Sequence, residues 1–341
     1  MLDVLIRGAG PVGCALALAL RESGLRVALL EQATLPPAFR PIALSYASRL
    51  ILERVAAWDG LAVTPIERIL VSQAGAFGRT RLDASDAGVP ALGYVTDYAA
   101  LLAELRARVE TTSEAADARC IVHAEGAPPG NEGKRYTQDA IVGLLHAEPS
   151  STATAFERFT PEGPLALLPL AGHYALIWSM RPEHAGRLMG ASDTEFLHEL
   201  NAIAGAAVGR GTKVEKRAVQ PLVLKVRGAR VEGNEVYIGN AAQTLHPVAG
   251  QGLNLGLRDA WDLARALFRE VSPESLARFA VQRRLDAGAT IRMTDFLAAG
   301  FAGDNALLRA ARGAALTALD IFPAPRRFFA RRMIFGAASI P

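Results

Sequence analysis

The sequence is poor in cysteine and has no long apolar run. Its two cysteines, Cys14 and Cys120, match neither the spacing of a metal site nor that of a redox pair. We therefore expect small buried side chains in a reducing compartment rather than reactive thiols. No apolar stretch reaches the roughly 18 residues of a membrane-spanning helix. The first predicted strand begins so close to Met1 that we expect no signal peptide.

The sequence also lacks a strong excess of charge and any recognisable hydrolytic or metal-binding arrangement. Its formal net charge of +3, spread over 341 residues, does not indicate nucleic-acid binding. Apolar residues make up 50% of the chain and charged residues 21%, which predicts a large buried core and argues against disorder. We find no Ser/His/Asp triad and no metal-ligand cluster in the sequence, and we assign no catalytic residue.

What the sequence does contain is a glycine-rich turn near its start. The apolar run Val4–Ile6 predicts a strand, and Gly8, Gly10 and Gly13 follow it with the spacing of a dinucleotide-binding turn that opens a helix. In such a turn Gly8 makes the tight bend, Gly10 admits a pyrophosphate, and Gly13 lets helix and strand pack closely.

A second strand and an acidic residue complete this unit. The strand is predicted at Leu25–Leu30, and Glu31 follows near the position where a carboxylate binds ribose hydroxyl groups. The complete unit is far more specific than three glycines alone. The candidate cofactor contacts in it are Gly8, Gly10, Pro11, Val12, Gly13, Glu31 and Gln32.

Another strand–loop–helix unit lies at residues 236–267. Val236–Ile238 is a short apolar run, and the apolar positions from Leu253 onward share one face of a helix. Gly250 and Gly252 immediately precede the predicted helix, where the absence of a Cβ atom lets a flat ligand approach the backbone. The unpaired N–H groups at the helix start are suited to stabilise an electron-rich oxygen. Taken alone, such a turn is more often an ordinary connection.

The amino-acid sequence of this second unit resembles a known flavin-binding motif. Gly239–Pro247, continuing through Gly250–Asp259, resembles the second flavin motif of the UbiH/UbiF/VisC family of FAD-dependent ubiquinone-biosynthesis aromatic hydroxylases. Many relatives have Gly-Asp where this chain has Gly239-Asn240, and Gly-Asn is common in the UbiH branch, the 2-polyprenyl-6-methoxyphenol hydroxylases. Residues 155–169 also match the family closely, so we identify the chain as a UbiH-like member.

The resemblance implies a bound FAD and the residues that contact it. In the second unit the implied contacts are Asn240, Pro247, Gly250, Gln251, Gly252, Leu253 and Asn254. The segment Arg40–Ser45 resembles another family segment and assigns Arg40 to the cofactor phosphates, for which a guanidinium fork is well suited. On the residues alone, a surface arginine explains Arg40 equally well. His246 is better explained as a structural loop residue than as a proton carrier.

The resemblance also implies an α/β fold. It has an FAD-binding Rossmann-like domain of the parahydroxybenzoate-hydroxylase type, an interleaved antiparallel substrate sheet and C-terminal helices. We assign residues 1–65, 93–134 and 231–270 to the FAD-binding domain, 66–92 and 135–230 to the substrate domain, and 271–341 to the helical C-terminal region. Strands of the substrate region are predicted at Ile69–Val71, Thr80–Leu82 and Leu92–Val95 among others.

Two features allow both a functional and a structural interpretation. Phe156, Phe159 and Trp178 either line an apolar cavity for a prenylated phenol or belong to the core, which is the commoner fate of an aromatic residue. The basic, amphipathic segment Arg326–Phe335 either contacts anionic lipid or docks through its phenylalanines with its arginines in water.

The family pattern is interrupted at residues 110–135. The family has a third parallel strand and a β-meander after the helix predicted at Asp97–Val109, but here Glu110–Arg119 leads directly to the apolar run Cys120–Val122. A further strand with its connections needs on the order of 30 residues. The family's Ala-Asp-Gly motif appears as Ala124-Glu125-Gly126. We therefore predict an internal deletion that affects the adenine-side contacts of FAD.

The implied activity is hydroxylation of the aromatic ring of a polyprenyl phenol in ubiquinone biosynthesis, with NAD(P)H as co-substrate and O2 as oxidant. The expected partners are that hydrophobic substrate, a ubiquinone-biosynthesis protein complex and the membrane surface, and we expect a cytoplasmic protein at the inner face of the membrane. One alternative is a catalytically impaired relative that acts as scaffold or lipid-binding partner of the complex. A flavin reductase or halogenase of the same fold class is a weaker one.

Overall fold

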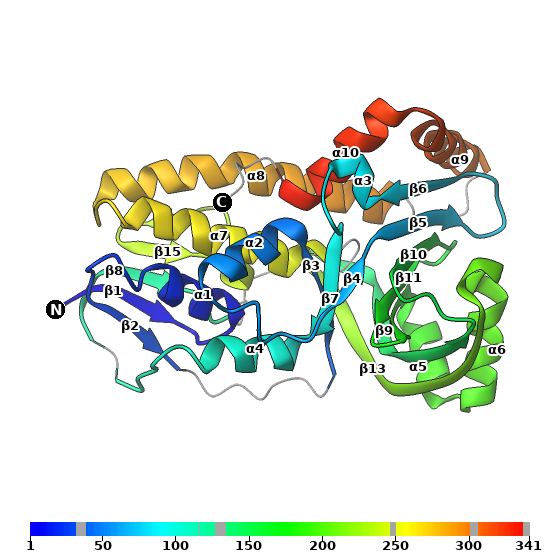
Figure 1. The fold of residues 1–341 in the computed structure, drawn as a ribbon, viewed down its shortest axis with the longest axis horizontal. Coiled ribbons are helices and arrows are strands. Elements are labelled where there is room, and N and C mark those ends of the chain that lie inside the picture. Colours follow the sequence, from blue (N-terminus) through cyan, green and yellow to red (C-terminus); the bar gives the residue numbers. More distant parts are fainter. Residues whose placement is uncertain (32–38, 115, 127–133, 246–249, 301–305, 337–341) are drawn as a thin grey trace.

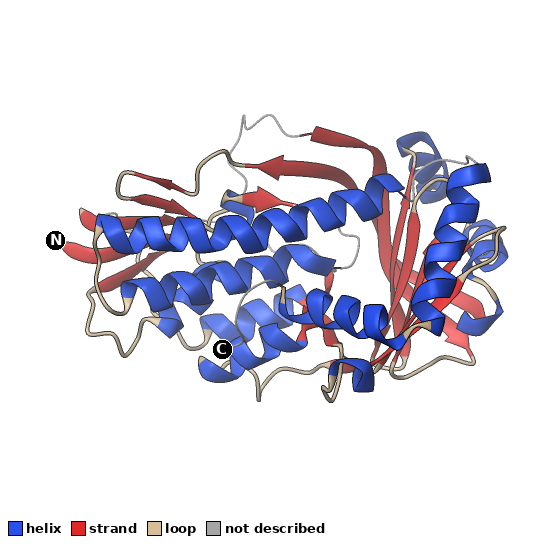
Figure 2. Cartoon of the chain, turned by 90° about the horizontal axis from the view of Figure 1, so that it is seen from above, coloured by secondary structure: helices blue, strands red, loops and turns tan. Residues whose placement is uncertain are grey.

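The computed structural model describes residues 1–31, 39–114, 116–126, 134–245, 250–300 and 306–336. Two large β-sheets lie toward opposite ends of the long axis of the molecule, and a small sheet lies between them (Figure 1). Helices pack along the sheet that carries the N-terminal strand, and further helices cover the other large sheet (Figure 2).

The first sheet carries the N-terminal glycine-rich turn. Its strand β1 lies inside the sheet because Val4, Leu5 and Ile6 are apolar and buried on both faces. The order is β14-β15-β8-β1-β2, parallel except for the hairpin of β14 and β15. The strands are β1 (Leu2–Arg7), β2 (Val27–Leu30), β8 (Ala118–His123), β14 (Val231–Glu232) and β15 (Glu235–Tyr237).

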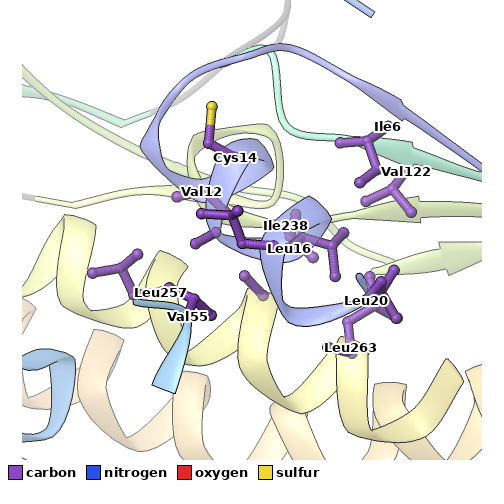
Figure 3. Packing of buried hydrophobic residues seen from close by; sticks show 14 of the residues in the cluster. Ile6, Val12, Cys14, Leu16, Leu20, Val55, Val122, Ile238, Leu257 and Leu263 are labelled. Atoms are coloured by element: carbon purple, nitrogen blue, oxygen red, sulfur yellow. The ribbon is translucent and has the colours of Figure 1, made fainter. Parts of the chain in front are cut away.

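Three helices form the core of this half of the molecule. Helix α1 is apolar and almost wholly buried, and its Leu16 shares a core cluster with Ile6 of β1 and Leu263 of α7 (Figure 3). As predicted, Cys14 and Cys120 are buried in this cluster, and burial raises their thiol pKa values to about 11 and about 12. The helices are α1 (Pro11–Ala19), α7 (Gln251–Leu267) and α8 (Pro273–Gly300).

The second sheet has the order β16-β13-β9-β12-β11-β10-β5-β6. Its neighbours are antiparallel except β10 and β5, which are parallel and come from separate parts of the chain. The strands are β5 (Arg68–Gln73), β6 (Arg79–Asp83), β9 (Lys134–Glu148), β10 (Thr154–Phe159), β11 (Pro164–Leu170), β12 (His173–Met180), β13 (Arg210–Val226) and β16 (Gln243–Thr244).

Helices α5 (Pro182–Gly190) and α6 (Asp193–Ala204) cover one face of this second sheet. Trp178 of β12 packs edge-to-face on Phe196 of α6, with ring centroids 5.9 Å apart. Trp178 is 1% exposed and lies on the helix-covered face. The structural interpretation of Trp178 is therefore the correct one.

The predicted placement of Leu92–Val95 in the substrate sheet is wrong. These residues overlap β7 (Gly93–Asp97), which pairs with β3 (Pro41–Ser45) and β4 (Thr64–Ile66) in a separate antiparallel sheet. A Cβ atom on Gly93 would lie 2.7 Å from the carbonyl oxygen of Leu44, so the close pairing with β3 requires glycine. Alternating apolar residues predict a strand but not its partner.

The stretch after α4, where a shortening relative to the family is predicted, leads to the edge of the first sheet. Helix α4 (Tyr98–Arg106) is followed, from Ala118, by β8, which inserts between β1 and β15. In the described part of the chain, the outer edge of β2 meets a single bridge, Leu30 to Thr112, in place of a further strand.

The remaining helices lie at the surface or above the small sheet. None of the helices in the described residues combines the length and the apolar character that a membrane span needs. The division of the chain at residues 65, 92, 134 and 230 stays a prediction. The helices not yet given are α2 (Tyr46–Arg54), α3 (Ala84–Ala87), η1 (Ala206–Val208), η2 (Gly239–Ala241), α9 (Ala306–Ile321) and α10 (Pro323–Phe335).

Candidate active site

A cavity of about 920 Å³ lies where the three sheets meet, and both glycine-rich turns line it. Gly13 lies behind the first turn, and Glu31 lies outside the lining. Gln32, Pro247 and His246 fall outside the described residues. The predicted cofactor contacts that line the cavity are Gly8, Gly10, Pro11, Val12, Arg40, Asn240, Gly250, Gln251, Gly252, Leu253 and Asn254.

The three glycines of the first turn differ in what surrounds them. A Cβ atom on Gly13 would lie 2.0 Å from the carbonyl oxygen of Gly8, and one on Gly8 would lie 2.6 Å from the Cα atom of Glu125. At Gly10 the nearest atom would be the hydroxyl oxygen of Tyr98, 3.8 Å away. Gly8 and Gly13 are therefore required by the fold, whereas Gly10 leaves open space beside the cavity.

The two helices that follow the glycine-rich turns have N-termini without a side-chain cap. Gly10 is the N-cap of α1 and Gly250 is the N-cap of α7, and neither can supply a side-chain hydrogen bond to the first turn. Neither first turn contains an acidic residue. A Cβ atom on Gly252 would meet no atom within 4 Å. Two positive helix ends with unpaired N–H groups therefore border one open space.

The two turns touch each other directly. The side chain of Val12 would lie 2.8 Å from a Cβ atom on Gly256 and 3.2 Å from one on Gly239. Glycine at these two positions lets α1 and α7 approach closely, and the contact fixes the distance between the two helix ends.

Asn254 holds the second loop in place through its side chain. Its Oδ1 atom accepts hydrogen bonds from the Ser45 amide (2.8 Å) and the Ser48 hydroxyl (2.7 Å). Its Nδ2 atom donates to the carbonyl oxygens of Ala43 (2.9 Å) and Gly250 (2.7 Å). Because the amide group is 2% exposed and fully hydrogen-bonded, it positions the loop, and its backbone remains for ligand contact.

Two arginines, Arg40 and Arg106, line the cavity beside the first glycine-rich turn. The Arg40 guanidinium lies 4.9 Å from the ring centroid of Tyr98, and both residues line the cavity. Arg106 of α4 also lines it, donates to the Ala9 carbonyl oxygen (3.1 Å) and forms an ion pair with Glu31 (3.0 Å). Sequence reasoning missed Arg106, because an arginine in the last turn of a helix is ordinary.

The second sheet gives the cavity an apolar wall. Neighbouring strands place one residue each in a row that faces the cavity: Thr80, Val71, Glu157, Ala166, Ile177 and Val142. Helices α9 and α10 close the wall with Leu316, Phe329, Met333 and Ile334. Phe156 and Phe159 also line the cavity, and Phe156 belongs at the same time to the core cluster that contains Trp178.

Glu157 is the acidic residue of this wall, and sequence reasoning missed it. Burial raises the pKa of its carboxyl group to about 8. The surface that Glu157 retains faces the cavity, so its carboxyl group is shielded from bulk water. The signal was present in the sequence, because Ala155, Glu157 and Phe159 share one face of a strand whose other inward residues are apolar.

The residues at the end of the cavity formed by the two glycine-rich turns and Arg40 suit an elongated dinucleotide with a flat ring. Uncapped helix N-termini bind phosphate or other electron-rich groups, arginine pairs with phosphate, and Gly10 and Gly252 leave the backbone accessible. The described residues contain no group of three or more side chains suited to hold a metal ion. The donor set therefore fits a flavin dinucleotide rather than a metal centre.

Comparison with known proteins agrees with this geometry. The model of a protein family described as an FAD binding domain matches residues 38–293. The ubiquinone hydroxylase UbiL of Rhodospirillum rubrum is 30% identical, and the alignment covers 96% of this chain and 88% of that protein. It spans 380 positions against the 341 residues here, so the relative has stretches without a counterpart in this chain.

A second relative and two solved structures extend the comparison. The 3-demethoxyubiquinol 3-hydroxylase of Escherichia coli is 26% identical over 93% of this chain and 94% of its own. The p-nitrophenol 4-monooxygenase PnpA of Pseudomonas putida has a TM-score of 0.78 at 16% identity and covers 99% of both chains. HpxO of Klebsiella pneumoniae, solved with FAD and uric acid, has a TM-score of 0.75 at 15% identity, covering 98% of this chain and 97% of its own. These two structures share the fold.

Proposed function

Because the chain belongs to the UbiH/UbiF/VisC-type family of FAD-dependent ubiquinone hydroxylases, we propose that it hydroxylates the ring of a polyprenyl phenol with NAD(P)H and O2. Family membership confirms the predicted FAD cofactor, the flavin-hydroxylase fold and aromatic monooxygenase activity. The prenylated substrate and the use of NAD(P)H are the proposal. The observation that supports it best is the single cavity that joins the two glycine-rich turns to an apolar wall.

In this proposal the residues at the end of the cavity formed by the two glycine-rich turns and Arg40 hold FAD. The N–H groups at the start of α1, beside Gly10 and Val12, and the Arg40 guanidinium face the diphosphate. The α7 N-terminus and the backbone of Gly250–Leu253 face the flavin ring, where they stabilise negative charge. Bound FAD supplies the redox chemistry, which couples NAD(P)H oxidation to oxygen transfer. The protein orients the substrate and excludes water.

The apolar wall supports a lipid-like substrate. Leu316, Phe329 and Met333 line the cavity from α9 and α10, and Leu308 lines it while remaining 50% exposed. The cavity therefore reaches the surface beside the start of α9. We assign the ring of the substrate to the β-sheet wall and its prenyl chain to the space along α9 and α10.

The outer surface of the same two helices supports contact with an anionic membrane. Residues 306–336 contain six arginines and one acidic residue. We define the α9–α10 surface by its exposed residues Leu307, Ile321, Phe322, Arg327, Phe328 and Arg331. Leu307 on α9 is 78% exposed and Phe328 on α10 is 72% exposed, so each helix presents a large apolar side chain to the surroundings. Arginines beside exposed apolar residues are typical of helices that lie on anionic lipid.

The test of the proposal is a spectrum followed by turnover. The purified protein with added FAD is expected to show bound-flavin absorbance. NADPH oxidation and O2 uptake should rise when a prenylated phenol is added, and the product should gain one oxygen atom. NADPH oxidation without stimulation by any prenylated phenol would contradict the proposed substrate. A protein that stays colourless with FAD but still binds the lipid would favour the scaffold alternative.

A further inference from the structure

Glu157 occupies a central place in the cavity wall. Strand β10 lies between β5 and β11, and Glu157 pairs with Val71 on one side and Ala166 on the other. Both neighbours are apolar and line the cavity. A carboxyl group in the middle of an apolar wall is costly unless a ligand uses it.

The carboxyl group of Glu157 has no hydrogen-bond or ion-pair partner within the residues that the structure describes. Its Oε1 atom is buried without a partner. The hydroxyl group of Thr80, which lies two strands away in the same row, is also buried and unpartnered. Buried polar groups in proteins are nearly always hydrogen-bonded. The carboxyl group of Glu157 is unpaired, and the surface that this residue retains lines the cavity, so it points to a polar group on the ligand.

We propose that Glu157 binds the phenolic hydroxyl group of the substrate and accepts its proton. The inference rests on the proposed function, since it deepens the description of that substrate site. Glu157 is a catalytic residue in this proposal because it touches the substrate.

The proton transfer is balanced within the enzyme–substrate pair. The O–H bond of the phenol breaks, an O–H bond to the Glu157 carboxylate forms, and the electron pair stays on the phenolic oxygen and spreads into the ring. A phenolate ring is more electron-rich than a phenol ring and reacts faster with an electrophilic oxygen. The ring carbon that gains the hydroxyl group releases its hydrogen as a proton, which the second oxygen atom of O2 takes up in forming water. The phenolic oxygen then regains a proton from the protonated Glu157, which restores the carboxylate.

The raised pKa of Glu157 suits this exchange. A phenol such as the tyrosine side chain has a pKa near 10, and an ordinary glutamate has one of about 4.3. Transfer of the proton from the phenol to an ordinary glutamate would be unfavourable by almost six pKa units. Transfer to a group with a pKa of about 8 is unfavourable by about two units. A general base is most effective when its pKa approaches the working pH.

The other titratable or charged groups that line the described cavity are less suitable. Arg40, Arg106 and Arg312 are cations and cannot accept a proton. Glu125 is bound to His123 Nδ1 at 2.8 Å, and Tyr98 lies beside the first glycine turn. Burial is the cause of the Glu157 shift, and no neighbouring charge contributes to it.

The first experiment measures binding without turnover. A prenylated phenol and its O-methyl ether are titrated into the FAD-loaded protein in the absence of NAD(P)H, at a pH above 8 so that Glu157 is ionised. The wild type is expected to bind the phenol at least 10-fold more tightly, because the ether cannot donate a hydrogen bond to the carboxylate. Glu157→Gln should reduce this preference to a few-fold. Glu183→Gln, an exposed change on α5, should leave it unchanged.

The second experiment measures the pH dependence of kcat/KM. The wild type is expected to gain activity as pH rises through about 8, because Glu157 must be deprotonated to accept the proton. Glu157→Gln should lower kcat/KM at least 100-fold and remove this rise, whereas Glu183→Gln should retain it. The isosteric change leaves no cavity, and flavin absorbance reports that each variant is folded.

The outcomes separate the two proposals. An unchanged preference for the phenol over the ether in Glu157→Gln overturns the inference. A rise of kcat/KM with pH that persists in this variant overturns it as well. If the wild type binds FAD but neither phenol nor ether, the proposed substrate class fails together with the inference. If the wild type hydroxylates the phenol but Glu157→Gln matches it, the inference alone fails.

Discussion

At the scale of single residues, Gly10 and Gly13 carry different physical requirements. A methyl group on Gly13 would overlap the carbonyl oxygen of Gly8 at 2.0 Å, whereas one on Gly10 would extend into open space. We expect Gly13→Ala to destabilise the protein by about 3 kcal/mol or more, because backbone atoms must move. Urea unfolding of the FAD-free protein measures this change.

Gly10→Val should leave stability nearly unchanged but weaken FAD binding. The FAD-free variant is expected to unfold within about 0.5 kcal/mol of the wild type, because the added atoms meet little protein. Its affinity for FAD should fall at least 10-fold, because the side chain occupies the approach to the α1 N-terminus. A titration followed by flavin fluorescence measures this, and unchanged affinity would contradict the assignment of this turn to FAD.

Glu157 also makes stability depend on pH. Its pKa is about 8 in the folded protein and near 4.5 in the unfolded chain, so the folded state holds one more proton between these values. Stability from this group is therefore complete below pH 4.5 and is lost as pH rises through 8. Between pH 5 and pH 9 the wild type should lose on the order of 3 kcal/mol relative to Glu157→Gln. Parallel urea titrations that show no difference would refute the burial of the carboxyl group.

The sequence reveals backbone requirements better than side-chain partners. Gly8 and Gly13 are recognisable because their spacing repeats a known turn, and the structure shows the close contacts that require them. Asn254 was correctly placed at the cavity, but its amide is used to hold the loop. Arg106 and Glu157 escaped prediction because their significance depends on which distant segments surround them.

At the scale of elements, α7 is joined to α8 through a buried charge network. Asp259 of α7, which is 0% exposed, forms an ion pair with Arg283 of α8 at 2.7 Å and another with Arg230 at 3.2 Å. It also accepts hydrogen bonds from the Gly239 amide (3.1 Å) and the Gln243 side chain (2.8 Å). The network thus links the helix pair to the start of the second flavin loop.

We expect Asp259→Asn to destabilise the protein by about 3 kcal/mol, because it leaves arginines buried without their full counter-charge. Burial opposes ionisation of Asp259, but Arg230 and Arg283 outweigh it and lower its pKa. The stabilisation is therefore present above about pH 4 and is lost as pH falls further. Thermal unfolding at pH 7 measures the loss.

The matched control is Glu53→Gln, which removes a half-exposed ion pair with Arg49 on α2. Surface pairs contribute less than about 1 kcal/mol, so this change should barely shift Tm. Equal shifts for the two variants would mean that the buried network adds nothing to stability.

Elements were easier to predict than their partners. Strand β1 and helices α1 and α7 lie near the expected positions because the spacing of their apolar residues is clear. Helix α7, however, begins at Gln251 and includes Gly252 in its first turn. Helix α5 was not predicted, and β13 is a long strand that runs from Arg210 to Val226. Alternation in that strand is broken by register shifts against β9, which hides it from pattern reading.

At the scale of the whole molecule, the α9–α10 surface predicts binding to anionic vesicles. The double change Arg327→Glu and Arg331→Glu should weaken sedimentation with vesicles rich in anionic lipid at least 10-fold, because each basic residue near a membrane contributes about 1 kcal/mol. Neutral vesicles should bind both proteins weakly.

The double change Arg54→Glu and Arg265→Glu alters net charge equally at exposed sites on α2 and α7 and should preserve vesicle binding. If both double variants lose binding to the same extent, general charge rather than the α9–α10 surface is responsible.

The meeting of the two glycine-rich turns could not be derived from local patterns. Each turn is readable by itself, but their approach depends on Val12 fitting against Gly239 and Gly256, which is a property of the folded chain. Resemblance to a family supplied that expectation in advance. The bridge at the edge of the first sheet was not predicted, because a single bridge between residues far apart in the sequence leaves no local pattern.

That edge has a consequence for how the enzyme is supplied with cofactor. The first sheet, in its described residues, ends at β2, whose last residues precede the acid expected beside the ribose. With a single bridge at Thr112 on the outer edge of β2, the adenosine half of FAD contacts little protein there and should dissociate faster. Free flavin in the cell, rather than the amount of polypeptide, would then set how many molecules are active at a given moment.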